Sequence, residues 1–438
     1  MDAPVYGGKY GRMFPELPAL EVEGEMLVEL GTDGGLCDGS EFAGSGVDDA
    51  PGVEAGWPIL GQFVAHDITA DRSPLQAHAN PGQLRNFRTP QLNLECVYGA
   101  GPAGSPYLYD LEEPAKLLIG ANDAGIPADL PRNSQGIALI GDPRNDVHLF
   151  MSQLHLAVMR VHNGIVDRLR EDGVEDAECF EDARRATTWH YQWLVLNEFL
   201  PKVVEEELVD QVMTGGARWY RTDGEPFIPL EFADAAYRYG HSQIRHAYEV
   251  NDRSGAIPLL PDLVGFRPVP AALTVDWTLL FDLPGSAPAQ RSKKIDGRLA
   301  RSLIDLPSEI TGETDGEYRS LATRDLVRGS STGLPSGEAV ARVLGQQPLD
   351  AEQVGLAGEG WQVETPLWFY VLKEAEACHD GTRLGPVGGR IVAEVLVTMI
   401  ERDPASYRAV DPEWRPTLPA ADERFGVADL LAFSEAAS

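Results

Sequence analysis

The segment GQFVAHDITA, residues 61–70, places Gln62, His66 and Asp67 in an otherwise apolar stretch. Residues four apart share one face of a helix, so Gln62 and His66 would point together while Asp67 points elsewhere. An imidazole can act as a base or a metal ligand near neutral pH, and an amide can hydrogen-bond beside it. The spacing therefore predicts two separate polar tasks within one turn.

Two further histidines, His155 and His162, are seven residues apart and share a helical face, so both could approach one metal ion. The sequence has no HExxH motif, and no further ligand follows at an interpretable spacing. Histidines among Leu, Val and Met are more often hydrogen-bonded parts of a core. The core interpretation is therefore favoured over a metal site.

The stretch GAGPAG, residues 99–104, matches the GxGxxG pattern of dinucleotide-binding proteins. That pattern requires a strand before it and a helix that opens on its last glycine. Pro102 and the following SPYLYD oppose such a helix, which argues against a nucleotide site.

The stretch GSSTG, residues 329–333, matches the GxSxG pattern of serine hydrolases, and a triad could be assembled in the usual order from Ser331, Asp350 and His379. The nucleophile of such enzymes follows a buried apolar strand. The preceding ATRDLVR is charged and has a helical pattern, so a hydrolase remains a weak alternative.

Apolar residues recur every three to four positions in long segments, and strand-like alternation is scarce. The pattern predicts helices over residues 146–170, 181–204, 230–250 and 388–404. We therefore expect a mainly α-helical protein with a single domain over residues 1–438, composed of a core of about 10–405 and a C-terminal tail, 406–438.

The chain of 438 residues has a formal net charge of −32, which argues against nucleic acid and anionic membranes as partners. No apolar run approaches the roughly 20 residues that span a bilayer, and the N-terminus lacks a signal-peptide pattern. The four cysteines are scattered, with no CxxC pair. We therefore expect reduced thiols and a cytoplasmic location.

Three segments carry a resemblance when they are taken together: GQFVAHD with His66, GDPRNDVHLFMSQLHLAVMRVHN with Arg144, and AAYRYGHSQI with His241. In this order they resemble the animal-type haem peroxidases of the peroxidase–cyclooxygenase superfamily. His241 is expected in the middle of the helix predicted over 230–250. The resemblance covers about residues 10–405 and looks closest to a bacterial branch that lacks signal peptides. Four further blocks fit: RTPQLNLECVYGAGP (88–102), NEFLPKVV (197–204), RDLVRGSSTGLPSG (324–337) and LGPVGGRIVAEVL (384–396).

The resemblance implies a role for each matching residue in peroxide cleavage at haem iron. Such cleavage needs an iron ligand, a base for the peroxide proton and a cation for the developing charge. His241 matches the proximal iron ligand, His66 the distal base and Arg144 the distal cation. Gln62 would hydrogen-bond distal water or a bound anion, and Arg238 and Arg328 match arginines near the haem propionates.

The resemblance also gives Asp67 its task, because the matching residue of the family ligates calcium. The other ligands would be Thr89, Gln91 through its carbonyl, Asn93 and Glu95. The usual loop has an aspartate in place of Asn93 and a serine in place of Glu95, so this chain keeps two carboxylates, which suit calcium. The alternative is that these groups only hydrogen-bond one another. In both cases Asp67 would tether the helix of His66.

Three positions depart from the mammalian members, which bind haem covalently. Ala65 and Val147 match the two residues that form ester bonds, and neither can form an ester. His148 matches the methionine through which myeloperoxidase forms a sulfonium bond. We therefore expect non-covalent, b-type haem.

Asp325 matches a position at which the family usually has an asparagine against the outer nitrogen of the proximal histidine. A carboxylate would make that imidazole more anionic and lower the reduction potential of the iron. Such an enzyme would oxidise phenols readily and chloride poorly. The alternative is that Asp325 points away, toward Arg328 or Arg324.

The leading functional hypothesis is a haem peroxidase that uses hydrogen peroxide to oxidise small organic reductants, with bromide, iodide or thiocyanate as further candidates. A fatty-acid oxygenase is the second hypothesis. Its radical tyrosine would stand three residues before the proximal histidine, where this chain has Arg238; Tyr237 and Tyr239 flank it and would lie on the wrong helix faces. A non-catalytic haem-binding protein is the third. Residues 253–289 are expected to include walls of the access route.

Overall fold

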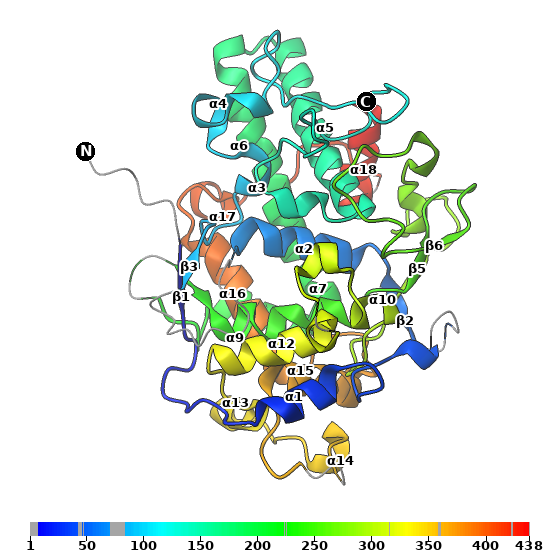
Figure 1. Ribbon diagram of the computed structural model, residues 1–438. Coiled ribbons are helices and arrows are strands. Elements are labelled where there is room, and N and C mark those ends of the chain that lie inside the picture. The colour runs from blue at the N-terminus through cyan, green and yellow to red at the C-terminus, as the bar shows by residue number, and fades with distance from the viewer. Residues whose placement is uncertain are drawn as a thin grey trace.

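Helices form most of the structure (Figure 1). The computed structural model describes residues 8–437, except for residues 43–45, 47, 71–83, 223, 225, 315, 358–360 and 422–423. The longer helices are α1 (Gly24–Gly31), α2 (Trp57–Ile68), α5 (Leu149–Glu171), α6 (Asp176–Leu194), α8 (Glu206–Gly215), α12 (Leu321–Ser331), α13 (Gly337–Val343), α15 (Leu367–His379), α16 (Pro386–Arg402) and α18 (Val427–Ala436). The expected mainly α-helical fold is confirmed.

Short helices and turns connect these elements. The four-residue helices are α3 (Glu95–Tyr98), α4 (Gly101–Gly104), α7 (Leu200–Val203), α9 (Leu230–Ala233), α10 (Arg301–Ile304), α11 (Ser308–Thr311), α14 (Ala351–Val354) and α17 (Tyr407–Val410). The 3-10 turns are η1 (Ser40–Phe42), η3 (Pro106–Leu108), η4 (Pro143–Asp146), η6 (Ala236–His241), η7 (Ala271–Leu273), η8 (Trp277–Leu279) and η9 (Glu317–Arg319).

The strands are short, with two to six residues each. β1 (Gly8–Gly11) pairs antiparallel with β3 (Arg85–Asn86) and parallel with β4 (Ile228–Pro229), with Gly8 opposite Asn86. Two antiparallel pairs complete the set: β2 (Asp49–Glu54) with β7 (Arg291–Lys293), and β5 (Ala247–Glu249) with β6 (Ala256–Pro258).

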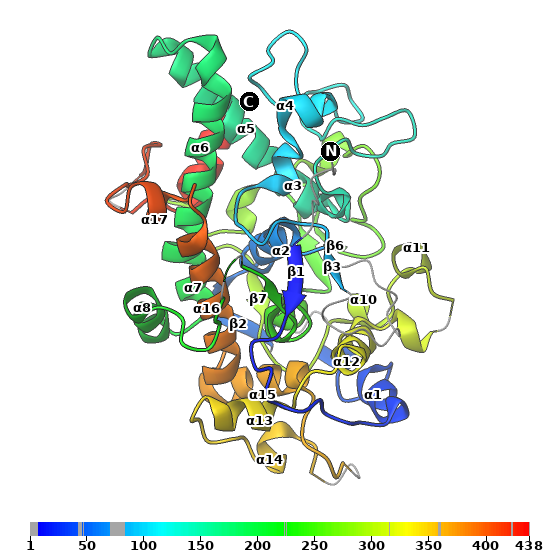
Figure 2. The ribbon, with the colours of Figure 1, turned by 90° about the vertical axis from the view of Figure 1, so that its left-hand side faces the viewer.

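Helix α2 crosses the middle of the molecule (Figure 1), where it packs against both α5 and η6. On one side of α2, helix α5 packs against α6 and α18. On the other side of α2, helix α12 packs against α1 and α15. In Figure 2, α16 stands along one side of the molecule, and it packs against α8 and α15. One apolar core runs through all of these elements and includes Leu431 of α18, so the segment after residue 405 packs onto the rest of the chain.

The sequence of α2 explains where it starts and which way it faces. Pro58 occupies the first turn, where its missing N–H costs no helical hydrogen bond. Ile59, Phe63 and Val64 are buried against the core. After the last turn Thr69 is extended, and its hydroxyl donates to the carbonyl of Ala65. The helix is therefore held in one orientation, which fixes the side chains on its remaining face.

Three of the four predicted long helices are confirmed with shifted ends. The helix predicted over 146–170 is α5, and the one predicted over 388–404 is α16. The one predicted over 181–204 begins earlier, as α6, and continues through a π turn (Val195–Phe199) into α7.

The single helix predicted over 230–250, with His241 in its middle, is wrong. The segment forms α9, the 3-10 turn η6 and then strand β5, and the chain breaks at Ala235, whose φ is −138° and ψ −81°. The Nε–H of Arg238 donates to the carbonyl of Ala233 at 2.9 Å. In a helix that continued past this point, the same carbonyl would accept from the N–H of Tyr237 instead. The side chain of Arg238 therefore ends α9.

Among the described residues, none of the helices combines the length and the apolar character that crossing a bilayer requires.

Candidate active site

A cavity of about 410 Å³ lies between α2 and η6. Apolar side chains, among them Leu259, Leu303 and Ile310, form much of its wall, and Leu259 belongs to the segment expected to line the access route. The polar or charged side chains that line it include Gln62, His66, Arg144, His148, Arg238 and His241. Residues predicted for the two sides of a haem therefore face one shared space.

His241 ends η6 and faces the cavity with about one third of its side chain exposed. Its Nδ1 lies 2.6 Å from Oδ2 of Asp325. Because an ionised carboxylate only accepts, Nδ1 of His241 carries a proton and donates the hydrogen bond to Asp325. Nε2 makes no hydrogen bond to the described residues, so it is available as a metal ligand.

Asp325, on α12, is fully buried and binds two partners. Oδ2 accepts from His241, and Oδ1 accepts from Nη1 of Arg238 at 2.7 Å. Burial raises the pKa of Asp325, but the charges and hydrogen bonds of His241 and Arg238 outweigh it and hold the pKa below its usual value. The predicted contact with His241 is thus present, and the guanidinium of Arg238 shares the same carboxylate.

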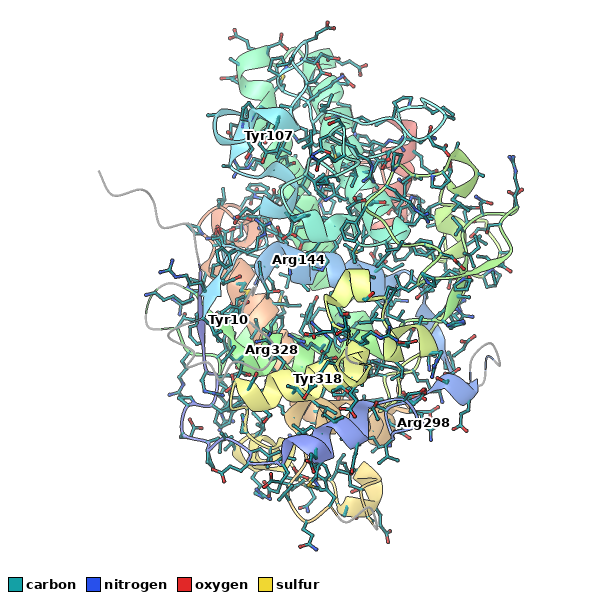
Figure 3. All side chains as sticks on the ribbon, viewed as in Figure 1. Tyr10, Tyr107, Arg144, Arg298, Tyr318 and Arg328 are labelled. Atoms are coloured by element: carbon teal, nitrogen blue, oxygen red, sulfur yellow. The ribbon has the colours of Figure 1, made fainter. Side chains whose placement is uncertain are left out.

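Arg238 contributes to the proximal side mainly through carboxylates. Its Nη2 donates to Asp234 at 2.9 Å. Burial lowers the pKa of Arg238, but the charges of Asp325 and Asp234 outweigh burial, so the pKa lies above its usual value. Arg328 lies one turn beyond Asp325 on α12 and is buried, but it is not among the described residues that line the cavity. Figure 3 labels Arg144 beside α2 and Arg328 near α12.

On the opposite wall, His66 is held by a buried amide. Its Nδ1 lies 2.8 Å from Oδ1 of Asn145, and Nδ2 of Asn145 lies 2.9 Å from Nδ1 of His155. This arrangement places the proton of His66 on Nδ1 and leaves the lone pair on Nε2. Burial and the nearby charge of Arg144 lower the pKa of His66 to about 3, so the ring is neutral at pH 7 and its Nε2 can accept a proton.

Arg144, in η4, is fixed by a carboxylate two residues before it. Asp142 accepts from the backbone N–H of Arg144 at 2.9 Å and from its Nε and Nη2 at 3.0 and 2.8 Å. Nη2 also donates to the carbonyl of His66 at 3.0 Å. Burial opposes ionisation of Asp142, but Arg144 and Arg88 hold its pKa well below the usual range. The cation is therefore held beside His66 while its side chain stays 37% exposed.

Asp67 does not line the cavity, as its position directly after His66 on the helix predicts. It is fully buried, and its carboxylate accepts from the backbone N–H groups of Leu94 and Cys96 at 3.0 and 3.3 Å. Burial raises its pKa to about 7. Asp67 thereby ties α2 to the loop that contains the other predicted calcium ligands.

The loop residues bind one another. Oε2 of Glu95 accepts from the N–H and hydroxyl of Thr89 at 3.0 and 2.7 Å, and Asn93 accepts from the N–H of Glu95 at 3.0 Å. The amide of Asn93 also donates to Gln91 at 3.3 Å. Arg88 pairs with Glu95 at 3.2 Å. These hydrogen bonds tie the loop together, and Oε2 of Glu95 accepts two of them from Thr89.

Tyr237 and Tyr239 were expected on helix faces that point away from the site, and this expectation is wrong because their segment is a 3-10 turn. Both side chains line the cavity. Tyr237 stacks on Phe232 with ring centroids 4.5 Å apart, and its buried hydroxyl has no partner among the described residues.

The competing motifs do not assemble into sites. Ser331 donates to the carbonyl of Arg328 at 3.0 Å, and the side chain of Asp350 caps α14. Within GAGPAG, residues 101–104 form the short helix α4 with Pro102 in its first turn, so the expectation that Pro102 opposes a helix is wrong. The required strand is absent, because α4 follows α3. His162 bonds Tyr98 at 3.1 Å and the carbonyl of Ala115 at 2.8 Å, as a core histidine does. Among the described residues, no three His, Cys, Asp or Glu side chains gather as a metal site.

Sequence reasoning missed three residues that support the site: Asn145, Asp142 and Arg88. Asn145 and Asp142 flank Arg144 in GDPRN, and this adjacency was the only available signal. Their partners lie 79 and 54 residues away in the chain, in His66 and Arg88, so local spacing does not report them.

The cavity fits a haem. Its walls are largely apolar, and the Nε2 atoms of two imidazoles, which make no bond to the described residues, belong to side chains that face it from opposite elements, α2 and η6. Ala65, Val147 and His148, which match the covalent attachment points of mammalian members, all line it. His241 would hold the iron, and the distal side would be formed by His66, Gln62 and Arg144.

Comparisons with known proteins agree with this geometry. The sequence model of the animal haem peroxidase family matches residues 58–352. Human thyroid peroxidase is 27% identical over 290 residues, which cover 59% of this chain and 30% of that protein. Heme peroxidase 2 of Caenorhabditis elegans is 27% identical over 181 residues, which cover 37% of this chain and 24% of that protein. The matching stretches thus span less than a third of these relatives.

Solved structures show the same fold at low identity. Peroxidase A from Dictyostelium discoideum aligns with a TM-score of 0.68 at 14% identity, covering 98% of this chain and 93% of that one. The fatty acid alpha-dioxygenase of Oryza sativa aligns with a TM-score of 0.59 at 15% identity, covering 83% and 70%. The match to the family model, together with the shared fold, places the chain in the peroxidase–cyclooxygenase superfamily. The chain belongs to the animal haem peroxidase family.

Proposed function

We propose that this protein is a haem peroxidase that uses hydrogen peroxide to oxidise small organic reductants or easily oxidised anions. The observation that carries the proposal is the pair of imidazoles, His66 and His241, which face one cavity with each Nδ1 bound to a protein oxygen. A haem bound there supplies an electrophilic, redox-active iron. The chain's own residues supply proton transfer and charge.

His66 and Arg144 divide the distal work. The neutral Nε2 of His66 takes the proton from one peroxide oxygen and delivers it to the other as the O–O bond breaks. The guanidinium of Arg144, fixed by Asp142, stabilises the negative charge on the leaving oxygen. Adding one equivalent of peroxide to the haem-loaded protein should change the Soret band within seconds, and a phenol should reverse the change. A protein that only binds haem would leave the spectrum unaltered.

A fatty-acid oxygenase is kept as a second candidate, because Tyr237 and Tyr239 line the cavity and the dioxygenase fold is similar. Arg238 stands at the position expected for a radical tyrosine and is bound to Asp234 and Asp325. Oxygen consumption with palmitate, measured beside peroxide-dependent phenol oxidation, separates the two candidates. Rapid oxygen uptake without phenol turnover would favour the oxygenase.

We propose that the haem is non-covalent, because Ala65 and Val147 line the cavity where the mammalian ester bonds form. Acid–butanone extraction of the denatured protein is expected to remove all of the haem. Haem that stays on the polypeptide would contradict this. The matched variant Ala65→Glu restores a carboxylate at one of these positions, and peroxide treatment of that variant is expected to make part of the haem resistant to extraction.

We propose that Asp325 lowers the reduction potential of the haem iron by accepting a hydrogen bond from Nδ1 of His241. In Asp325→Asn a charge-assisted hydrogen bond becomes a neutral one, a difference of about 1 kcal/mol, so the potential should rise by roughly 40 mV. Spectroelectrochemical titration measures it. Asp234→Asn is the matched control, since it removes the other carboxylate of Arg238 without touching His241. Equal shifts in the two variants would mean that Asp325 does not act through His241.

We propose that Asp67 and the loop of Thr89, Gln91, Asn93 and Glu95 bind one calcium ion. The donors are all oxygens and include two carboxylates, which suits calcium, although Arg88 already pairs with Glu95. Metal analysis should find one calcium per chain, and Asp67→Ala should lose it. Asn93→Asp adds a third carboxylate and should retain calcium against a chelator longer. A native protein without calcium, whose melting temperature a chelator does not change, would leave the hydrogen-bonded loop alone as the tether.

A cytoplasmic location is also a proposal. It is supported by the four cysteines, all of which are free in the structure.

A further inference from the structure

His148 lies at the N-terminus of α5, and its backbone is held by the loop that follows Leu260. The N–H of Leu149 donates to the carbonyl of Leu263 at 2.9 Å, and the N–H of Gly265 donates to the carbonyl of Val147 at 3.0 Å. A Cβ on Gly265 would lie 1.8 Å from the carbonyl oxygen of Asp146, so the two segments approach as closely as a glycine allows. The ring of His148 therefore starts from a rigid position.

Two hydrogen bonds define the proton position of this ring. The backbone N–H of Met151 donates to Nδ1 of His148 at 3.3 Å. A backbone N–H can only donate, so Nδ1 must carry the lone pair. His148 is 6% exposed, and burial lowers its pKa to about 3, which keeps the ring neutral at pH 7. Its single proton is then on Nε2.

That proton determines which way the amide of Gln62 faces. Nε2 of His148 lies 3.0 Å from Oε1 of Gln62, so Nε2–H donates to the amide oxygen. The amide nitrogen of Gln62 is left over, makes no hydrogen bond to the described residues, and belongs to a side chain that lines the cavity. A reversed amide would place N–H₂ against N–H and lose this bond.

We propose that His148 is a positioning residue, which holds the amide of Gln62 so that its N–H₂ group points into the cavity and favours ligands that accept hydrogen bonds. The complementary ligands are small anions and peroxide oxygens, and groups that only donate are disfavoured. The inference rests on the proposed function in one respect, that a haem occupies the cavity. Only a side chain with an N–H can hold the amide in this way, and a methionine in place of His148 would offer none.

The test measures anion binding, not turnover. Fluoride is titrated into the ferric, haem-loaded protein, and its dissociation constant is read from the visible spectrum. His148→Phe keeps an aromatic ring but removes the N–H, so fluoride should bind about tenfold more weakly. In a Gln62→Leu background the amide is already absent, and the same His148→Phe change should have no further effect. This dependence on Gln62 separates positioning from a general disturbance of the pocket.

Two results would overturn the inference: unchanged fluoride binding in His148→Phe, or an equal loss in both backgrounds. If His148→Phe fails to fold, the native protein still gives an answer through nitrogen NMR of ¹⁵N-histidine-labelled protein. The His148 signal, assigned by its absence in His148→Gln, should show a bare Nδ1 and a protonated Nε2; the reverse tautomer would refute the proposal. Neither measurement uses peroxide, so failure of peroxidase activity and failure of this inference are distinguishable.

Discussion

The His241→Ala variant is expected to lose stable haem binding, and with it all peroxide-dependent activity. His241 is the imidazole on the η6 side of the cavity, and its Nε2 makes no hydrogen bond to the described residues. Alanine at this position provides no ligand for iron. Haem content per chain, measured as the pyridine complex, should fall to the background of non-specific binding.

The matched control is His379→Ala, because His379 lies at the end of α15 and outside the residues that line the cavity. Its haem content should equal that of the native protein. The melting temperatures of the two haem-free variants separate ligand loss from unfolding. A normal Soret band and normal turnover in His241→Ala would refute the assignment of the iron ligand.

The His66→Ala variant is expected to bind haem normally but to react with peroxide roughly 10² to 10⁴ times more slowly, which is the usual cost of removing a general base. His66 is neutral, and its Nε2 faces the cavity beside Arg144. Stopped-flow absorbance of the Soret band after mixing with peroxide gives the rate.

A comparison variant tests whether the loss belongs to the base itself. Thr69→Ser changes another residue that lines the cavity next to the end of α2, keeps the hydroxyl that donates to Ala65, and leaves His66 and Asn145 in place. Its rate should stay near that of the native protein. A rate in His66→Ala within threefold of native would show that another group takes the peroxide proton.

Local spacing predicted part of this site and could not predict the rest. The separate directions of His66 and Asp67 follow from the helix geometry of one short segment, and the structure has both. The partner of His241 was predicted only through a family resemblance, because Asp325 lies 84 residues away. The residues around Asn145 form no pattern that predicts its contact with His66, which lies 79 residues away in the chain.

The proximal segment shows why a strong helical pattern can fail. Apolar spacing over 230–250 favours a helix, but the pattern contains no information on what a side chain bonds once the chain is folded. Arg238 bonds to the carbonyl of Ala233 and to Asp234 and Asp325, and these contacts outweigh one further turn of backbone hydrogen bonds. The resulting 3-10 turn also brings Tyr237 to the cavity.

In the described part of the chain, the walls of the cavity come from five stretches, within 58–69, 144–148, 232–244, 259–260 and 303–321, which lie far apart in the sequence. A molecule that fills this space contacts all five at once, so it completes the interior of the folded chain as well as its chemistry. Any ligand that binds only the folded state shifts the folding equilibrium toward it. We therefore expect the haem-free protein to melt at a lower temperature than the haem-loaded protein, and to be cut faster by a protease.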